Sequence, residues 1–208
     1  TKAVGRIRKV DDRRVKVKYI ATDENLGGIL DFNKEQARHN LLLGYYDAIK
    51  VFKGLRGRKY YLEPTNDEEL FMNFLLAPGE QNIVRLGEDL GLKDIPYRRL
   101  MFEHIIPRLT SLLELEKESS YEDLVIAILE YIAFEYQVNR FIVYSFESFL
   151  EEIRKALNGR LPFGDEDIAK LPGFVRHSDV LSRAVKDRVL REIIRELFGE
   201  YLQKGCTH

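Results

Sequence analysis

The chain changes character near Pro64, and this change limits the folds that it can adopt more than any other feature. Before Pro64, β-branched and aromatic residues alternate with Lys and Arg in short runs, whereas after it apolar residues recur at helical spacing. A period of two is typical of a half-buried strand, and a period of 3.6 is typical of an amphipathic helix. The sequence therefore predicts a small β-barrel domain at residues 1–63 and an all-helical domain at residues 64–208, an α+β protein.

The sign of the net charge changes at the same point. Residues 1–63 contain 15 Lys and Arg against 8 Asp and Glu, a net charge of +7, while the remainder contains 18 against 26, a net charge of −8. A strongly basic domain attracts polyanions, which favours nucleic acid as its partner. The opposite charges also allow a second interpretation, in which the basic domain packs against the acidic helices of its own chain.

Five strands are expected in the basic domain, at residues 4–10, 13–20, 26–32, 45–53 and 58–63. A helix that begins after Asn33 and ends at Gly44 separates the third strand from the fourth. This element order is typical of an OB-fold, a five-stranded barrel that commonly binds oligonucleotides or oligosaccharides. An SH3-like barrel accommodates the same strands, so the OB-like and SH3-like alternatives both stay open.

One face of this barrel is predicted to bind single-stranded nucleic acid. Cations neutralise phosphates and release counterions, and exposed aromatic rings stack on unpaired bases. Alternation places Phe52 and Tyr61 among the outward-facing cations, and the turn with Gly54 and Gly57 lets backbone N–H groups approach a phosphate. The candidate binding residues are Arg6, Arg8, Arg14, Lys16, Lys18, Lys50, Phe52, Lys53, Arg56, Arg58, Lys59 and Tyr61. The competing interpretation is an ordinary solvated face in a highly charged protein.

Residues 83–100 resemble the helix-turn-helix motif, with Gly87 where two helices would cross and Gly91 at the turn. This resemblance implies that Tyr97, Arg98 and Arg99 contact base edges from the start of the second helix. Acidic and basic residues are balanced around the motif, so a plain helical corner explains the same spacing.

Capping and breaking residues mark the other helices. Pro107 is expected to kink or break a helix near Ile106. Ser119 and Ser120 with Glu122 and Asp123 are expected to form a capping box for a long apolar helix that starts at Tyr121. Glu130 and Glu135 on that helix are expected to pair with Arg or Lys. The last helix has an apolar stripe that either packs within the bundle or pairs with a second copy in a homodimer.

Several kinds of chemistry leave no signature in the chain. There is no phosphate-binding loop, dinucleotide-binding glycine motif or nucleophile elbow, and the four His residues are far apart, so no cofactor or metal is expected. An active site assembled from residues distant in sequence stays open. One cysteine, Cys206, forms no internal disulfide, and polar residues such as Glu130 interrupt the longest apolar stretch, so we expect a cytoplasmic protein without a membrane span. Abundant Glu, Lys and Arg suggest a thermophilic source.

These observations favour a non-enzymatic protein that binds single-stranded DNA or RNA through its basic domain, with the helical domain serving assembly or a second contact. The alternative is a protein–protein adaptor in which each domain binds a protein partner. A third hypothesis is an enzyme or ligand-binding protein that uses a pocket between the domains.

Overall fold

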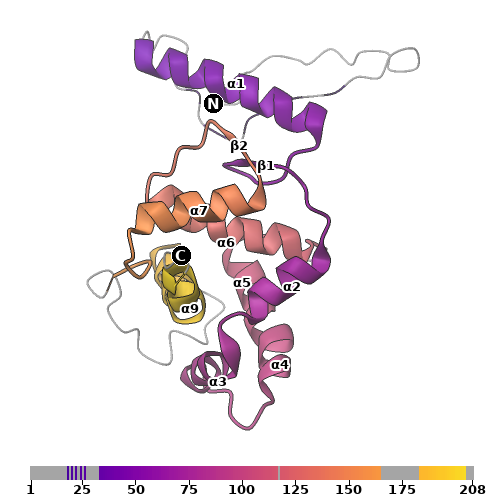
Figure 1. The fold of residues 1–208 in the computed structure, drawn as a ribbon, viewed down its shortest axis with the longest axis vertical. Helices are drawn as coiled ribbons and strands as arrows, with labels where there is room; N and C mark the ends of the chain where they lie inside the picture. Colours follow the sequence, from indigo (N-terminus) through magenta and orange to yellow (C-terminus); the bar gives the residue numbers. More distant parts are fainter. Residues whose placement is uncertain are drawn as a thin grey trace. The chain divides into compact units, whose positions relative to one another are not determined.

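A computed structural model describes residues 18, 20, 22, 24, 26, 33–116, 118–164 and 183–204 of the protein. The chain forms two compact units, whose helices and strands are shown in Figure 1. Unit 1 comprises Thr1–Pro64 and Asn139–Tyr144, and unit 2 comprises Thr65–Val138 and Ser145–His208. A short segment between two helices of unit 2 therefore belongs to unit 1.

The main element of unit 1 is one long helix, α1 (Lys34–Lys53). It begins as the sequence predicts, because Oδ1 of Asn33 accepts hydrogen bonds from the backbone N–H groups of Glu35, at 2.9 Å, and Gln36, at 3.4 Å. These N–H groups have no partner within the helix. The predicted end at Gly44 is wrong: α1 ends at Gly54, which has a left-handed φ of 67°.

Two short strands complete unit 1. Strand β1 (Tyr61–Leu62) pairs in parallel with β2 (Val143–Tyr144), and Glu63 N–H donates to the carbonyl of Tyr144 at 2.9 Å. Leu62 also exchanges two backbone hydrogen bonds with Arg56, at 2.8 and 3.1 Å. These bonds attach the 139–144 segment to the chain that follows α1.

The five-stranded barrel predicted for residues 1–63 is wrong. Residues 45–53, predicted to be a strand, form the second half of α1, and only Tyr61 and Leu62 of the predicted strand at 58–63 lie in a sheet. The expected strands at 4–10, 13–20 and 26–32 lie outside the described residues, apart from three positions that belong to no strand. Among the described residues, the protein is therefore mainly helical with one two-stranded parallel sheet, neither OB-like nor SH3-like.

The physical reason lies in the ambiguity of a short apolar run. Tyr45, Ile49 and Phe52 have the spacing of one helix face as well as an approximate alternation with Lys50. A helix that is already nucleated after Asn33 extends at little further cost, and an internal glycine such as Gly44 weakens it by only about 1 kcal/mol. The helix therefore continues until Gly54.

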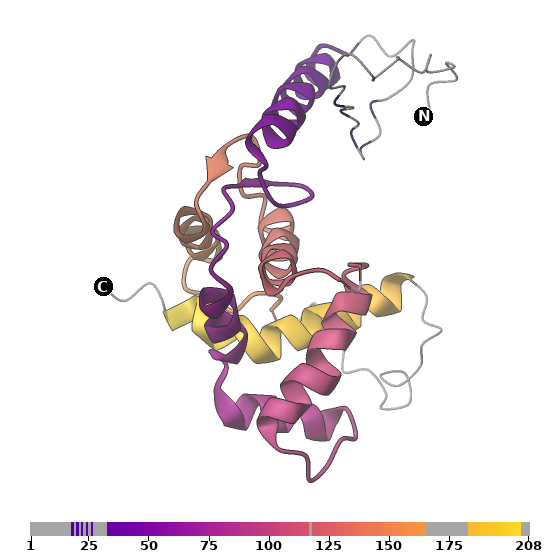
Figure 2. The same ribbon diagram turned by 90° about the vertical axis from the view of Figure 1, so that its right-hand side faces the viewer.

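Unit 2 is built from helices. They are α2 (Glu68–Leu76), α3 (Gly79–Asp89), α4 (Tyr97–Arg99), the π-helix η1 (Leu100–Ile105), α5 (Ile106–Leu112), α6 (Tyr121–Glu135), α7 (Phe146–Leu157) and α9 (Arg183–Lys204). Helix α6 packs against both α2 and α7, and α9 packs against α3, α5 and α7 (Figures 1 and 2).

The centre of unit 2 is α6. The predicted capping box is confirmed: Oγ of Ser120 accepts from Asp123 N–H at 3.1 Å, and Oδ2 of Asp123 accepts from Ser120 N–H at 3.1 Å. From Leu124 to Ala133, every residue except Tyr131 is buried. A helix that is apolar all round is expected to lie inside a bundle, and α6 does so.

The chain from Tyr97 to Leu112 remains helical through Pro107. In η1 the Ile106 N–H donates to the carbonyl of Met101, five residues earlier, as in a π-helix. Proline has no N–H, and its ring clashes with the carbonyl four residues earlier in an α-helix. The wider π turn accommodates this ring, so the helix that was expected to be broken near Ile106 is locally widened.

Helix α9 is the last element of unit 2. Three members of its predicted stripe are buried, with Val189, Ile193 and Leu197 at most 2% exposed, while Val185 and Tyr201 are half-buried. Arg191 donates to both carboxylate oxygens of Glu135, at 3.0 and 3.1 Å, which confirms the predicted pairing of Glu135 with a cation. The stripe predicted to pack in a bundle or in a homodimer therefore packs within unit 2.

None of the helices in the described part of the chain combines the length and the apolarity that a bilayer crossing requires.

Candidate nucleic-acid interface

Helix α1 carries large apolar side chains on a face exposed to solvent. Leu41 is 73% exposed, Tyr45 59% and Phe52 70%. Their spacings of four and seven residues place them on one side of an α-helix, and Tyr45 and Phe52 are about 10 Å apart along the axis. We call these three residues the α1 apolar face. Exposed apolar groups of this size commonly mark a contact surface.

Cations gather at the C-terminal end of this helix. Lys50 and Lys53 lie in its last turn, and Arg56, Arg58 and Lys59 follow in the next six residues. Nζ of Lys18 donates to the carbonyl of Val51 at 3.2 Å and lies 5.2 Å from the centroid of the Phe52 ring. We call Lys18, Lys50, Lys53, Arg56, Arg58 and Lys59 the basic end of α1. Of these cations, Lys18 lies over the exposed Phe52 ring.

The loop after α1 is held in place from within unit 1. Gly54 and Gly57 have positive φ values of 67° and 93°, which side chains with a Cβ rarely adopt. Leu55 is 6% exposed and Tyr60 is 1% exposed, so two buried side chains anchor the loop at either end. Arg58 and Lys59 lie between these anchors and are exposed to solvent.

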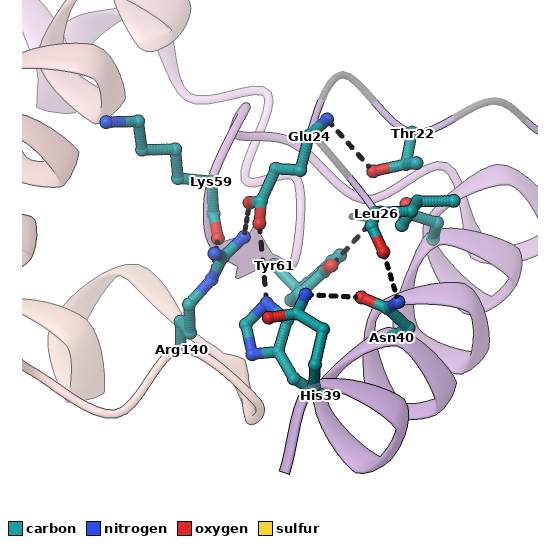
Figure 3. Close-up of polar contacts among 10 residues, drawn as sticks. Thr22, Glu24, Leu26, His39, Asn40, Lys59, Tyr61 and Arg140 are labelled. Carbon is teal, nitrogen blue, oxygen red and sulfur yellow. Dashed lines mark hydrogen bonds and ion pairs between the residues drawn. The ribbon is translucent and has the colours of Figure 1, made fainter. Parts of the chain in front are cut away.

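A polar cluster links segments of unit 1 that are distant in sequence (Figure 3). The Glu24 carboxylate forms a close ion pair with Arg140, and it lies 3.4 Å from Nε2 of His39, on α1. Nε of Arg140 also donates to the carbonyl of Lys59 at 3.2 Å. Arg140 therefore contacts both the N-terminal segment and the loop that carries part of the basic end.

The charges in this cluster change the pKa values of its members. Burial alone would raise the pKa of Glu24, but the hydrogen bond and charge of Arg140, with a smaller contribution from His39, hold it below its usual value. Burial, the hydrogen bond to Asp47 at 3.0 Å and the Asp47 charge raise the pKa of Tyr61 well above its usual value. Glu24 is therefore a stable anion, and Tyr61 is a neutral hydrogen-bond donor.

Aromatic rings pack beside the polar cluster. The ring of Tyr46, on α1, lies 5.0 Å from that of Tyr61 and 5.7 Å from that of Phe141, between ring centroids. His39 meets Phe141 edge-on at 5.2 Å. The ring of Tyr46 also meets that of Tyr45 edge-on at 5.3 Å, so the aromatic group contacts one member of the α1 apolar face.

The structure brings seven of the predicted nucleic-acid-binding residues to one region. They are Phe52 and the six residues of the basic end, Lys18, Lys50, Lys53, Arg56, Arg58 and Lys59. Arg6, Arg8, Arg14 and Lys16 lie outside the described residues. Tyr61 is 2% exposed in β1, so the expectation that its ring faces outward is wrong. Its outward position depended on the alternation of a barrel strand that does not form.

The three helix-turn-helix candidates lie in unit 2, at the start of the helix that follows the turn at Gly91. The packing of the two helices is as expected, because a Cβ on Gly87 would lie only 2.8 Å from Cδ1 of Leu100. Arg99 donates twice to Glu103, at 2.9 and 2.8 Å, and Nε of Arg98 donates to the hydroxyl of Tyr97 at 3.1 Å. A role for Tyr97, Arg98 and Arg99 in DNA binding stays a prediction.

Sequence reasoning missed Leu41, Tyr45 and Arg140. The i, i+4, i+11 spacing of Leu41, Tyr45 and Phe52 is the signal that could have revealed the α1 apolar face, provided that the helix was extended past Gly44. No local signal assigns Arg140 to unit 1, because its partners Glu24 and Lys59 are more than 80 residues away.

Within the described ranges, no group of three or more His, Cys, Asp or Glu residues is arranged to hold a metal ion. The chain matches no protein-family model, no curated protein and no solved structure.

Proposed function

We propose that unit 1 binds single-stranded nucleic acid at the basic end of α1, with Phe52 as the stacking ring. The observation that carries this proposal is the 70% exposure of Phe52 with Nζ of Lys18 5.2 Å from its ring centroid, at the basic end of α1. Contact with water does little to stabilise an apolar ring of this size. A base stacked on it contributes about 1–3 kcal/mol to the free energy of binding. The cations of the basic end attract the phosphates on either side of that base.

One feature favours an unpaired strand over a duplex. Phe52 and Tyr45 project from one helix face about 10 Å apart, a spacing that suits bases splayed along a flexible backbone. In this proposal the cations of the basic end contact phosphates, which are the same in every sequence, and the Phe52 ring can stack on any base. We therefore expect binding with little sequence preference, to both DNA and RNA.

Replacement of the exposed ring tests this function. Phe52→Ala is expected to weaken binding of a fluorescent oligothymidylate by about 5- to 150-fold, the loss of one stacked base. Phe134→Ala is the matched control, because Phe134 is 51% exposed but lies on α6, in unit 2. Fluorescence anisotropy at fixed low salt measures both affinities, and oligouridylate and duplex DNA provide the comparison ligands.

The proposal fails if the two variants bind with equal affinity, or if the wild-type protein binds duplex DNA as tightly as oligothymidylate. Phe52 contacts solvent over most of its surface, so its truncation is expected to leave the fold intact. Circular dichroism of both variants checks this expectation.

A second candidate function has its own observation. Leu41 is 73% exposed and is the N-terminal member of the α1 apolar face, and an aliphatic side chain offers no stacking surface to a base. With exposed Lys34 and Arg38 nearby, the face suits an amphipathic helix of a partner protein with acidic flanking residues. This is the adaptor alternative, in which α1 docks a protein.

Photo-cross-linking separates the two candidates. A photoreactive residue at position 41 is expected to capture one discrete protein at an acidic helix, located by mass spectrometry, and the same residue at exposed Met72 of α2 is not. Cross-links that form equally from both positions would contradict the adaptor function. Oligonucleotide binding that blocks the cross-link would show that one face serves both ligands.

A further inference from the structure

Unit 2 contains a cavity of about 630 Å³ beside the widened helix at Pro107. Helices α2, α5 and α6 supply most of its wall, and these helices are neighbours in unit 2 (Figure 1). The apolar part of the lining includes Ile106, Pro107, Leu115 and Leu124, of which Leu124 is 2% exposed. The size suits a small organic molecule.

The polar side chains of the lining that can accept a hydrogen bond are a carboxylate and several hydroxyls. They are the Glu68 carboxylate and the hydroxyls of Thr110, Ser111, Ser119 and Ser120. Two of these hydroxyls already donate elsewhere: Thr110 to the carbonyl of Ile106 at 2.9 Å and Ser120 to Asp123 at 2.8 Å. Each can still accept through a remaining lone pair. Among the described residues that line the cavity there is no Lys, Arg or His.

Glu68 determines the charge that the cavity accepts. Its Oε1 atom accepts a hydrogen bond from the backbone N–H of Tyr121, at 3.4 Å, in the first turn of α6. A helix N-terminus ordinarily favours an anion, but here a carboxylate of the protein already lies at that position. An anionic ligand would be repelled by Glu68, whereas a cation would find a carboxylate, hydroxyl lone pairs and the ring of Tyr121.

We propose that this cavity binds a primary ammonium group attached to a compact apolar body. The ammonium donates to Glu68 and to a hydroxyl, and the apolar body lies against Ile106, Pro107 and Leu124. The π turn contributes by placing the Pro107 ring in the cavity wall without breaking the helix that carries Ile106 and Thr110. The proposal is independent of the function proposed for unit 1.

Three isosteric probes test the charge preference on the full chain: benzylamine, benzyl alcohol and benzoate. Methyl NMR of Ile106, Leu115 and Leu124 reports where each probe binds. We expect benzylamine to bind with a dissociation constant of about 1 mM or tighter, as its few heavy atoms allow. Benzyl alcohol should bind at least about 5-fold more weakly, since its neutral hydroxyl donates to Glu68 without the charge–charge attraction that the ammonium adds. Benzoate should cause no shift in these methyl groups.

The variant Glu68→Gln is expected to remove the preference for benzylamine over benzyl alcohol. Glu69→Gln is the matched control, because Glu69 is the next acidic residue in the first turn of α2 and does not line the cavity. The proposal is overturned if benzyl alcohol binds as tightly as benzylamine, if Glu68→Gln leaves the ratio unchanged, or if no methyl group shifts. Methyl spectra of both variants without probe show that the fold is retained.

Discussion

Glu24 connects three stretches of unit 1 through one carboxylate. It pairs with Arg140 of the 139–144 segment and contacts His39 of α1, while Arg140 reaches the Lys59 carbonyl. Only about a third of the Glu24 side chain is exposed, and Arg140 is 16% exposed, so solvent screens the pair less than it screens a surface pair. Loss of either charge would leave its partner partly buried without compensation.

The lowered pKa of Glu24 has a consequence at acid pH. A carboxyl with a folded-state pKa below its usual 4.5 stabilises the fold fully above that pH, and the stabilisation is lost as the pH falls through the folded value. We expect the carboxyl carbon of Glu24 to titrate below 4.5 by NMR, and Arg140→Gln to raise the pKa. Protection of the Glu63 amide, which donates to the Tyr144 carbonyl of the segment, should fall over the same pH range.

Arg160→Gln is the control for this titration, because Arg160 is an exposed arginine of unit 2. It should leave the pKa of Glu24 unchanged. A wild-type pKa at or above the usual value, or the same pKa in both variants, would contradict the role assigned to Arg140.

Among the elements, the starts of α1 and α6 could be predicted from local sequence, whereas the end of α1 could not. Asn33 and Ser120 cap α1 and α6 as expected, because capping bonds join residues within one turn and depend on local sequence alone. The predicted stop at Gly44 failed because its surroundings impose no left-handed φ, whereas Gly54 does adopt one. The pairing of β1 with β2 left no sequence signal, since two-residue strands separated by about 80 residues carry no periodicity.

Replacement by alanine should change stability differently at two helical glycines. A Cβ at Gly44 of α1 meets nothing within 4 Å, whereas at Gly87 of α3 it would lie 2.8 Å from buried Leu100. Gly44→Ala is therefore expected to stabilise unit 1 by about 0.5–1 kcal/mol through helix propensity. At Gly87 the same gain is opposed by overpacking of about 1–3 kcal/mol, so Gly87→Ala should be neutral or destabilising.

Hydrogen exchange of the α1 and α3 amides, measured at increasing denaturant concentration, gives the free energy of unfolding of each unit and so measures these two effects. The helix-by-helix values are needed because the two glycines lie in different units. If Gly87→Ala stabilised α3 as much as Gly44→Ala stabilises α1, the close contact between Gly87 and Leu100 would be wrong.

For the whole molecule, the division into units makes the charge asymmetry larger. Unit 1 with its 139–144 segment contains 16 Lys and Arg against 8 Asp and Glu, a net charge of +8, and unit 2 contains 17 against 26, a net charge of −9. The cations of the candidate site could be found from the sequence, because Lys50, Lys53 and Lys59 lie close together along the chain. The apolar face could not, because it depended on recognising α1 as one helix.

The central claim is that the basic end of α1 contacts the phosphates of a single strand, and salt dependence tests it most directly. Each phosphate contact on a single strand contributes about −0.7 to the slope of log affinity against log salt concentration. We expect a steep slope for oligothymidylate, and we expect Lys50→Glu/Lys53→Glu to weaken binding and reduce the magnitude of the slope by about 1.4. Lys93→Glu/Arg160→Glu makes the same charge change at exposed positions of unit 2 and should leave the slope unaltered. A wild-type affinity that does not vary with salt, or equal slopes in the two double variants, would contradict the account.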